Sequence, residues 1–206
     1  MTPDLARPPA GPALRILLVD DDPARSAALR EGLALAGHAL AGQVGPRDDL
    51  SAALRLAGAD VVIASLSSPG RDTLESLARA TADNPKPVVM FVGEAGAALA
   101  VDAIRAGVSA YVVDGLSPHR VRPVLEAAVA RFAEFQRLKA ELERSRAALA
   151  ERKVVERAKG LLMRQRGVAE DEAYRMLRKA AMDQNRRVGE VAEALVSAAR
   201  MLGPDL

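Results

Sequence analysis

The sequence predicts a doubly wound α/β domain, then a long helix with a coiled-coil seam, then an all-α domain of three helices. Two kinds of pattern lead to this fold class. Short continuous apolar runs alternate with helix-patterned segments in the N-terminal part, as in βαβ units. Helix-favouring residues dominate residues 120–166, and helical apolar stripes among many basic residues continue to the C-terminus. We therefore expect four parts, at residues 1–13, 14–132, 133–152 and 153–203.

Residues 1–13 and the overall composition exclude several classes of protein. The first residues are rich in Pro and Ala and lack the apolar stretch of a signal peptide, so we expect a disordered leader. The chain has no Cys and two His, which rules out disulfides and thiolate sites and leaves a metal centre almost without ligands. No apolar run is long enough to span a bilayer. We expect a soluble, cytoplasmic protein that has no membrane partner.

Four apolar runs in residues 14–132 have the continuous character of buried parallel strands. They are Leu14–Asp20, Asp60–Leu66, Pro87–Val92 and Ser109–Val113. Segments with helical periodicity alternate with them, at Ala24–Leu35, Leu50–Leu56, Thr73–Ala80, Ala97–Ala106 and Arg120–Phe132. In such a sheet the functional site lies beyond the carboxyl ends of the strands. That rule selects the segments that begin at Asp20, Ser65, Val92 and Asp114.

The stretches ILLVDDDP and DVVIASLSSPGRD resemble a response-regulator receiver domain, and the resemblance covers the whole predicted α/β domain. It implies a flavodoxin-like fold. In that family an acidic pair binds Mg²⁺, an Asp at the end of the third strand takes the phosphoryl group, and a Thr or Ser and a Lys respond to it. The resemblance puts Asp20 and Asp21 at the acidic pair, Ser65 at the acceptor, Val92 at the hydroxyl switch and Asp114 at the lysine.

These departures predict a pseudo-receiver that is not phosphorylated and serves as a docking and dimerisation module. A serine hydroxyl with no adjacent base is a poor nucleophile, so Ser65 is a weak acceptor. Asp114 puts an anion where a cation would pair with the phosphoryl group. Asp20, Asp21 and Asp114 still offer oxygen ligands to a divalent ion. Because the acceptor carboxylate is missing, Mg²⁺ binding is the less favoured alternative, and we expect no cofactor.

The linker at residues 133–152 has an apolar seam that steps by three and four residues, as the a and d positions of a coiled coil do. The seam consists of Phe135, Leu138, Leu142 and Leu149. It predicts a homodimer. The alternative is a monomeric spacer helix exposed to solvent.

Three short amphipathic helices are expected in residues 153–203. Gly167 ends the first of them, and Asn185, which tolerates the left-handed conformation, ends the second. Ala169 takes the N-cap of the second helix, where it provides no capping oxygen. Tyr174 follows the apolar stripe of this helix and is expected in the core.

The segments AKGLLM, EDEAYRMLRKAAM and VGEVAEALV resemble the ANTAR domain of AmiR and NasT type transcription antitermination regulators. The segments PVVMFV and AGVSAYVVDGL are most similar to the nitrate-assimilation branch. The resemblance implies binding to paired stem-loops in a leader mRNA, which prevents a terminator from forming. It also implies control by a ligand-sensing protein that sequesters the regulator.

Basic residues in the C-terminal block indicate a polyanionic partner, although a solvated helix surface explains a charge run equally well. The residues expected at the RNA are Lys159, Arg164, Arg166, Arg178, Asn185, Arg186 and Arg187. Two other functions stay open: a DNA-binding response regulator, and an adaptor that dimerises without binding RNA. An enzyme is the least expected class, and we predict none, because no nucleophile–base pair or metal cluster is visible.

Overall fold

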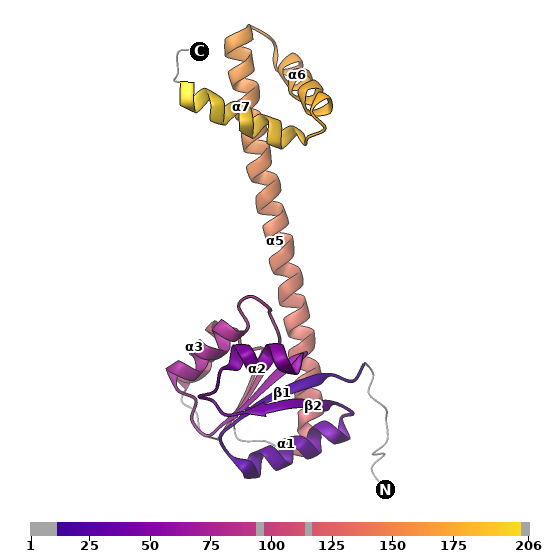
Figure 1. The fold of residues 1–206 in the computed structure, drawn as a ribbon, viewed down its shortest axis with the longest axis vertical. Coiled ribbons are helices and arrows are strands. Elements are labelled where there is room, and N and C mark those ends of the chain that lie inside the picture. The colour runs from indigo at the N-terminus through magenta and orange to yellow at the C-terminus, as the bar shows by residue number, and fades with distance from the viewer. Residues whose placement is uncertain (1–11, 94–96, 114–116, 203–206) are drawn as a thin grey trace. The chain divides into compact units, whose positions relative to one another are not determined.

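The computed structural model describes residues 12–93, 97–113 and 117–202. Most of the expected leader and the switch position Asp114 therefore lie outside the described residues. The chain forms two compact units, Met1–Gln136 and Arg137–Leu206. The N-terminal unit is an α/β unit, and the C-terminal unit is helical (Figure 1).

The N-terminal unit contains a five-stranded sheet with the strand order β2-β1-β3-β4-β5, in which every pair of neighbours is parallel. Its strands are β1 (Arg15–Asp20), β2 (Ala39–Val44), β3 (Val61–Leu66), β4 (Val88–Val92) and β5 (Ala110–Val113). The helices between them are α1 (Pro23–Leu35), α2 (Leu50–Ala57), α3 (Arg71–Ala80) and α4 (Ala97–Arg105). This order is that of a flavodoxin-like sheet, which confirms the predicted fold class.

The strand β2 was missed by the sequence analysis. It lies at the edge of the sheet, pairs only with β1, and leaves most of its residues partly or fully exposed. Its sequence ALAGQV lacks the continuous run of large apolar residues that identifies a buried parallel strand.

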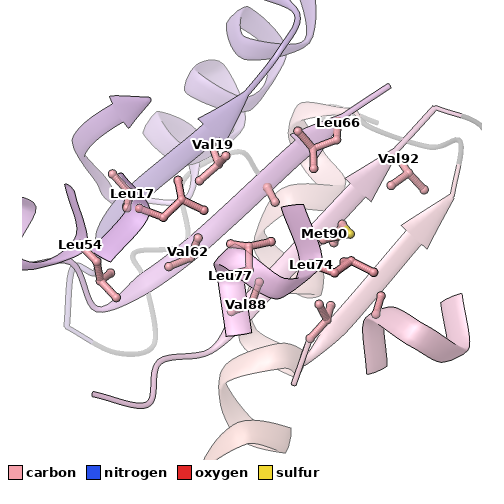
Figure 2. Close-up of a cluster of buried hydrophobic side chains, with 14 of the residues drawn as sticks. Leu17, Val19, Leu54, Val62, Leu66, Leu74, Leu77, Val88, Met90 and Val92 are labelled. Carbon is pink, nitrogen blue, oxygen red and sulfur yellow. The ribbon is translucent and has the colours of Figure 1, made fainter. Parts of the chain in front are cut away.

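Helices cover both faces of the sheet, as the doubly wound fold requires. Alternate strand residues point to opposite faces, so each strand contributes to two apolar clusters. Figure 2 shows one cluster, in which side chains of β1, β3 and β4 meet Leu54 of α2 and Leu74 and Leu77 of α3. The other cluster joins the opposite face to Leu29 of α1 and to Leu125 of the long helix after β5, α5 (Pro118–Arg166). In Figure 1, α2 and α3 lie on one side of the sheet and α1 on the other.

The helix α5 (Pro118–Arg166) runs without interruption for 49 residues, which confirms the single long helix predicted from the sequence. Its first turns pack against the sheet through the buried residues Val121, Leu125 and Ala128. Further along, the seam residues Phe135, Leu138, Leu142 and Leu149 expose between 50% and 63% of their surface.

The C-terminal unit packs α6 (Glu170–Asp183) and α7 (Val188–Leu202) against the last part of α5. Its core is small and consists of Ala158, Leu177, Ala181, Val191 and Ala192, with partly buried apolar residues around them. Helices of this length are marginal by themselves, so their shared core stabilises all three.

Both turns in this unit use a residue with a left-handed backbone. Gly167 has φ 66° and donates its N–H to the carbonyl of Met163 at 3.0 Å. Asn185 has φ 51°, and Arg186 closes the end of α6 by donating to the carbonyl of Ala181 at 2.9 Å. Both helix ends thus agree with the sequence prediction. None of the helices within the described residues combines the length and apolar character needed to cross a membrane.

Candidate functional site

A groove of about 840 Å³ crosses the C-terminal unit where α6 ends and α7 begins. Glu151 of α5 and Glu190 of α7 are among its lining residues. Four residues that the sequence predicted for RNA binding line it together: Arg178, Asn185, Arg186 and Arg187. All four are exposed, and three of them carry a positive charge. The groove therefore offers guanidinium and amide donors to a polyanion.

Tyr174 also lines the groove, and the expectation that it lies in the core is wrong. Its side chain is 45% exposed. The buried stripe of α6 is formed by Ala173, Leu177 and Ala181, which recur every four residues. Tyr174 is one position further, about 100° around the helix, so its ring points to the rim of the core rather than into it. An aromatic ring thus lies beside the groove cations.

The turn that carries two of the arginines is held by Glu190. Its Oε2 accepts a hydrogen bond from the backbone N–H of Arg187 at 3.3 Å, as the acid of a capping box does. The same oxygen lies 3.5 Å from Nε of Arg186. Glu190 was missed by the sequence analysis, although its place three residues after Arg187 at a helix start was a usable signal.

Lys159 does not lie on an exposed basic surface, contrary to the sequence prediction. The residue is 8% exposed, and its Nζ lies 2.8 Å from Glu156 and 2.6 Å from Glu170. The hydrogen bonds that Lys159 donates to these two carboxylates raise its pKa, the bond to Glu156 most. Glu170, one of the three acids in the first turn of α6, draws the lysine inward, whereas Asp171 and Glu172 pair with Arg175. Its position is that of a structural cation.

Arg164 and Arg166 are exposed in the last turn of α5, but neither lines the groove. The seven predicted residues therefore do not form one patch. Four line the groove, two lie at the end of α5, and Lys159 is buried.

The acidic pair of the N-terminal unit lies at the end of β1, where the fold places it. Asp20 is 8% exposed and accepts hydrogen bonds from the backbone N–H of Asp22 at 2.9 Å and from the hydroxyl of Ser26. Oδ1 of Asp21 lies 2.6 Å from Nη2 of Arg25, a residue that the sequence analysis did not consider. A basic residue four positions after the second aspartate, at the start of a helix, was the available signal.

The phosphoacceptor position is closed. Ser65 is fully buried at 0% exposure, and its hydroxyl has no hydrogen-bond partner among the described residues. Ser65 lies beside Asp20 in the register between β1 and β3. Val92, at the expected hydroxyl switch, is 4% exposed and packs into the apolar cluster of Figure 2. A phosphate donor in solvent therefore has no path to the Ser65 hydroxyl.

Comparisons with known proteins agree with this division of the chain. Residues 143–196 match the family described as the ANTAR domain. The transcriptional regulatory protein PdtaR of Mycobacterium tuberculosis is 31% identical over 182 residues, which cover 88% of this chain and 89% of the relative. The nitrate regulatory protein of Klebsiella oxytoca is 45% identical over 64 residues, 31% of this chain and 16% of that protein.

The N-terminal unit also resembles solved structures in its fold. A CheY-like response regulator receiver domain protein from Methanospirillum hungatei superimposes with a TM-score of 0.52 at 21% identity. The match covers 60% of this chain and 98% of that structure. At this identity the likeness concerns the fold alone.

Proposed function

Because the chain belongs to the family of ANTAR-domain transcriptional regulators with a receiver-like N-terminal domain, we propose that it is an RNA-binding antiterminator. It binds stem-loops in a leader mRNA and prevents a terminator from forming, so that transcription continues. It acts in the cytoplasm, where leader transcripts are made.

The groove of the C-terminal unit carries this proposal. It brings to one surface Tyr174 and Arg178 of α6 with Asn185 and Arg187 of the turn that follows. Proteins recognise RNA hairpins through phosphate contacts and through loop bases that leave the stack and lie on aromatic or guanidinium planes. The groove contains both kinds of group. In our proposal the arginines contact the phosphates of the loop, and the Tyr174 ring stacks on an unpaired base.

Two copies of the chain act together in this proposal. The apolar seam on α5 leaves Leu138, Leu142 and Leu149 at least half exposed in one chain. Pairing two such seams in a coiled coil removes them from water. A homodimer formed in this way brings two grooves to one leader transcript, which fits a target of paired stem-loops.

We further propose that a ligand-sensing protein, and not phosphorylation, controls the regulator. Support comes from the burial of Ser65 and from the apolar residue at Val92. A receiver takes and senses a phosphoryl group through accessible side-chain oxygen atoms, and neither position offers one. A partner that binds the α/β unit is the simplest replacement.

The test uses the full chain, a leader hairpin RNA and duplex promoter DNA in direct competition. We expect the hairpin to bind in preference to the duplex, and Arg178→Gln with Arg187→Gln to weaken its binding by about tenfold or more. Lys179→Gln is the matched control, because Lys179 is an exposed cation on α6 outside the groove.

Two results would support other functions. Preference for the duplex would favour a DNA-binding response regulator. Failure to cross-link RNA in cells, together with no hairpin binding in vitro, would favour an adaptor. A transcription assay on a leader template completes the test, since an antiterminator must increase read-through past the terminator.

A further inference from the structure

The acidic site of the N-terminal unit already contains a cation that belongs to the protein. Arg25, in the first turn of α1, places Nη2 2.6 Å from Oδ1 of Asp21. Nε of the same guanidinium lies 3.5 Å from Oδ2 of Asp22. The positive charge therefore faces Asp21 and Asp22, the two aspartates that directly follow β1.

The same guanidinium reaches the ends of the neighbouring strands. Nη2 donates to the hydroxyl of Ser67, immediately after β3, at 2.6 Å. Nη1 reaches Gly93, the residue after β4. A β-carbon added to Gly93 would lie 3.2 Å from this nitrogen. Arg25 thus spans the carboxyl ends of β1, β3 and β4, which is where this fold class places its ligand site.

This ion pair is more enclosed than an ordinary surface pair. The side chains of Arg25 and Asp21 are 20% and 31% exposed. Asp21 also accepts from the backbone N–H of Ser67 at 3.2 Å. A charge-assisted bond that is short, partly desolvated and supported by further donors holds its geometry better than an exposed pair does.

With Arg25 in place, the residues at this site do not fit a divalent metal ion. Mg²⁺ requires several oxygen ligands at close to octahedral positions. The Asp21 carboxylate is bound by Arg25 and Ser67, and that of Asp20 accepts from a backbone N–H and from Ser26. Ser65 contributes a neutral, fully buried hydroxyl where a carboxylate would be the third ligand. Among the described residues, no three acidic or histidine side chains are placed to hold a metal.

We infer that Arg25 replaces the divalent cation at this site and excludes it. The guanidinium neutralises the acidic pair and joins the end of β1 to the residue that follows β3. A receiver with this internal cation stays in one arrangement whether or not Mg²⁺ or an acyl phosphate is present. The role concerns the N-terminal unit, so it does not depend on RNA binding.

Mn²⁺ binding to the full chain, followed by electron paramagnetic resonance, tests the inference. We expect no saturable binding to the wild-type protein at millimolar Mn²⁺. Arg25→Ala frees the Asp21 carboxylate and should bind one Mn²⁺ about tenfold more tightly or better. Arg30→Ala is the matched control, because Arg30 lies on the same helix and contacts Gln43 rather than an acid.

A second readout is the effect of Mg²⁺ on Tm, since a ligand that binds only the folded state stabilises it. Mg²⁺ should raise the Tm of Arg25→Ala and leave that of the wild type unchanged. Arg25→Gln, which keeps an N–H donor for Ser67 but no charge, serves if Arg25→Ala fails to fold. The inference is overturned if the wild type binds Mn²⁺ as tightly as the variants, or if neither variant binds more tightly than the wild type.

Discussion

The ammonium nitrogen of Lys159 lies 2.6 Å from Oε1 of Glu170, so a buried lysine of α5 is joined to the first residue of α6. Glu170 begins a helix whose first turn is acidic and whose N-cap, Ala169, makes no side-chain hydrogen bond. Its link to Lys159 therefore fixes the start of α6 on α5. The core of this unit is small, so a single such link matters for its stability.

We predict that Lys159→Met lowers the Tm of the C-terminal unit without changing the salt dependence of RNA binding. The raised pKa of Lys159 means that its stabilising charge is fully present below the ordinary lysine pKa of about 10.4 and is lost only as the pH rises through the raised value. At neutral pH the variant loses that whole contribution. Circular dichroism measures Tm. Lys179→Met is the control, because Lys179 is exposed. An unchanged Tm with a flatter salt dependence would instead assign Lys159 to the RNA surface.

Tyr174 supplies a test of base stacking in the groove. Tyr174→Ala should weaken hairpin binding by about tenfold or more, because base–aromatic stacking contributes ~1–3 kcal/mol. Tyr174→Phe keeps a ring and should bind nearly as well as the wild type. Because Tyr174 is 45% exposed, Tyr174→Ala should cost less stability than the truncation of a fully buried residue.

Leu177→Ala is the contrasting control for Tyr174. Leu177 is 2% exposed, so its truncation should cost roughly 2–5 kcal/mol of stability. Equal hairpin affinity for Tyr174→Ala and the wild type would remove the ring from the interface. A loss in Tyr174→Phe as large as in Tyr174→Ala would point to the hydroxyl rather than to stacking.

Arg186 and Arg187 are predicted to contact phosphates. Each phosphate contact adds ~0.7–0.9 to the slope of log affinity against log salt concentration. Arg186→Gln with Arg187→Gln should therefore reduce the slope by roughly 1.4–1.8. Filter binding over a KCl series measures it, and Lys179→Gln should keep the wild-type slope. A lower affinity at an unchanged slope would mean that these arginines position the turn and do not contact phosphate.

Most of the fold was predictable because buried parallel strands and amphipathic helices leave clear sequence patterns. The four predicted apolar runs are strands within one residue of their expected starts, as Val61 and Val88 illustrate. The edge strand β2 has no such pattern, since Gly42 and Gln43 interrupt its apolar character. Pairing with β1 makes it a strand, and this is a tertiary effect that the local sequence does not encode.

The candidate site was predictable only in part. Helical periodicity indicates on which face of a helix a residue lies, but it does not indicate which residue of another segment packs against that face. Arg178 and Arg187 were expected on an exposed surface and are found there. Lys159 was expected beside them, but Glu170 of the next helix draws it inward. Arg25 was overlooked for the same reason, since its contact with Ser67 joins segments that are 42 residues apart.

His38 gives the N-terminal unit a predictable pH dependence. Burial lowers its pKa, Arg122 lowers it further, and its Nδ1 accepts from the backbone N–H of Leu14 at 3.3 Å. The neutral form is therefore favoured in the folded state. Its stabilising contribution is present above the unfolded pKa of about 6.5 and is lost as the pH falls from there through the lowered folded value.

His38→Asn should remove that pH dependence. Urea unfolding of the wild type and the variant, compared between roughly pH 7.5 and pH 5.5, should give midpoints that converge on acidification. Carboxylates that titrate equally in both proteins shift both urea midpoints equally, so they do not affect the difference between the midpoints. Parallel curves over this range would show that His38 is not the group responsible.

Ala169 is the position where one substitution should stabilise the C-terminal unit. It has the extended backbone of an N-cap, with φ −73° and ψ 163°, but no side-chain oxygen. In Ala169→Ser the hydroxyl can accept from the N–H of Glu172, three residues later, which contributes about 1 kcal/mol. Glu172 already pairs with Arg175 at 2.7 Å, so we count only this one new bond. For a unit of this size Tm should rise by roughly 4–8 °C. Ala169→Val, which adds bulk without an oxygen, should not raise the Tm. If the Tm of Ala169→Ser is at or below that of Ala169→Val, capping does not limit the stability of α6.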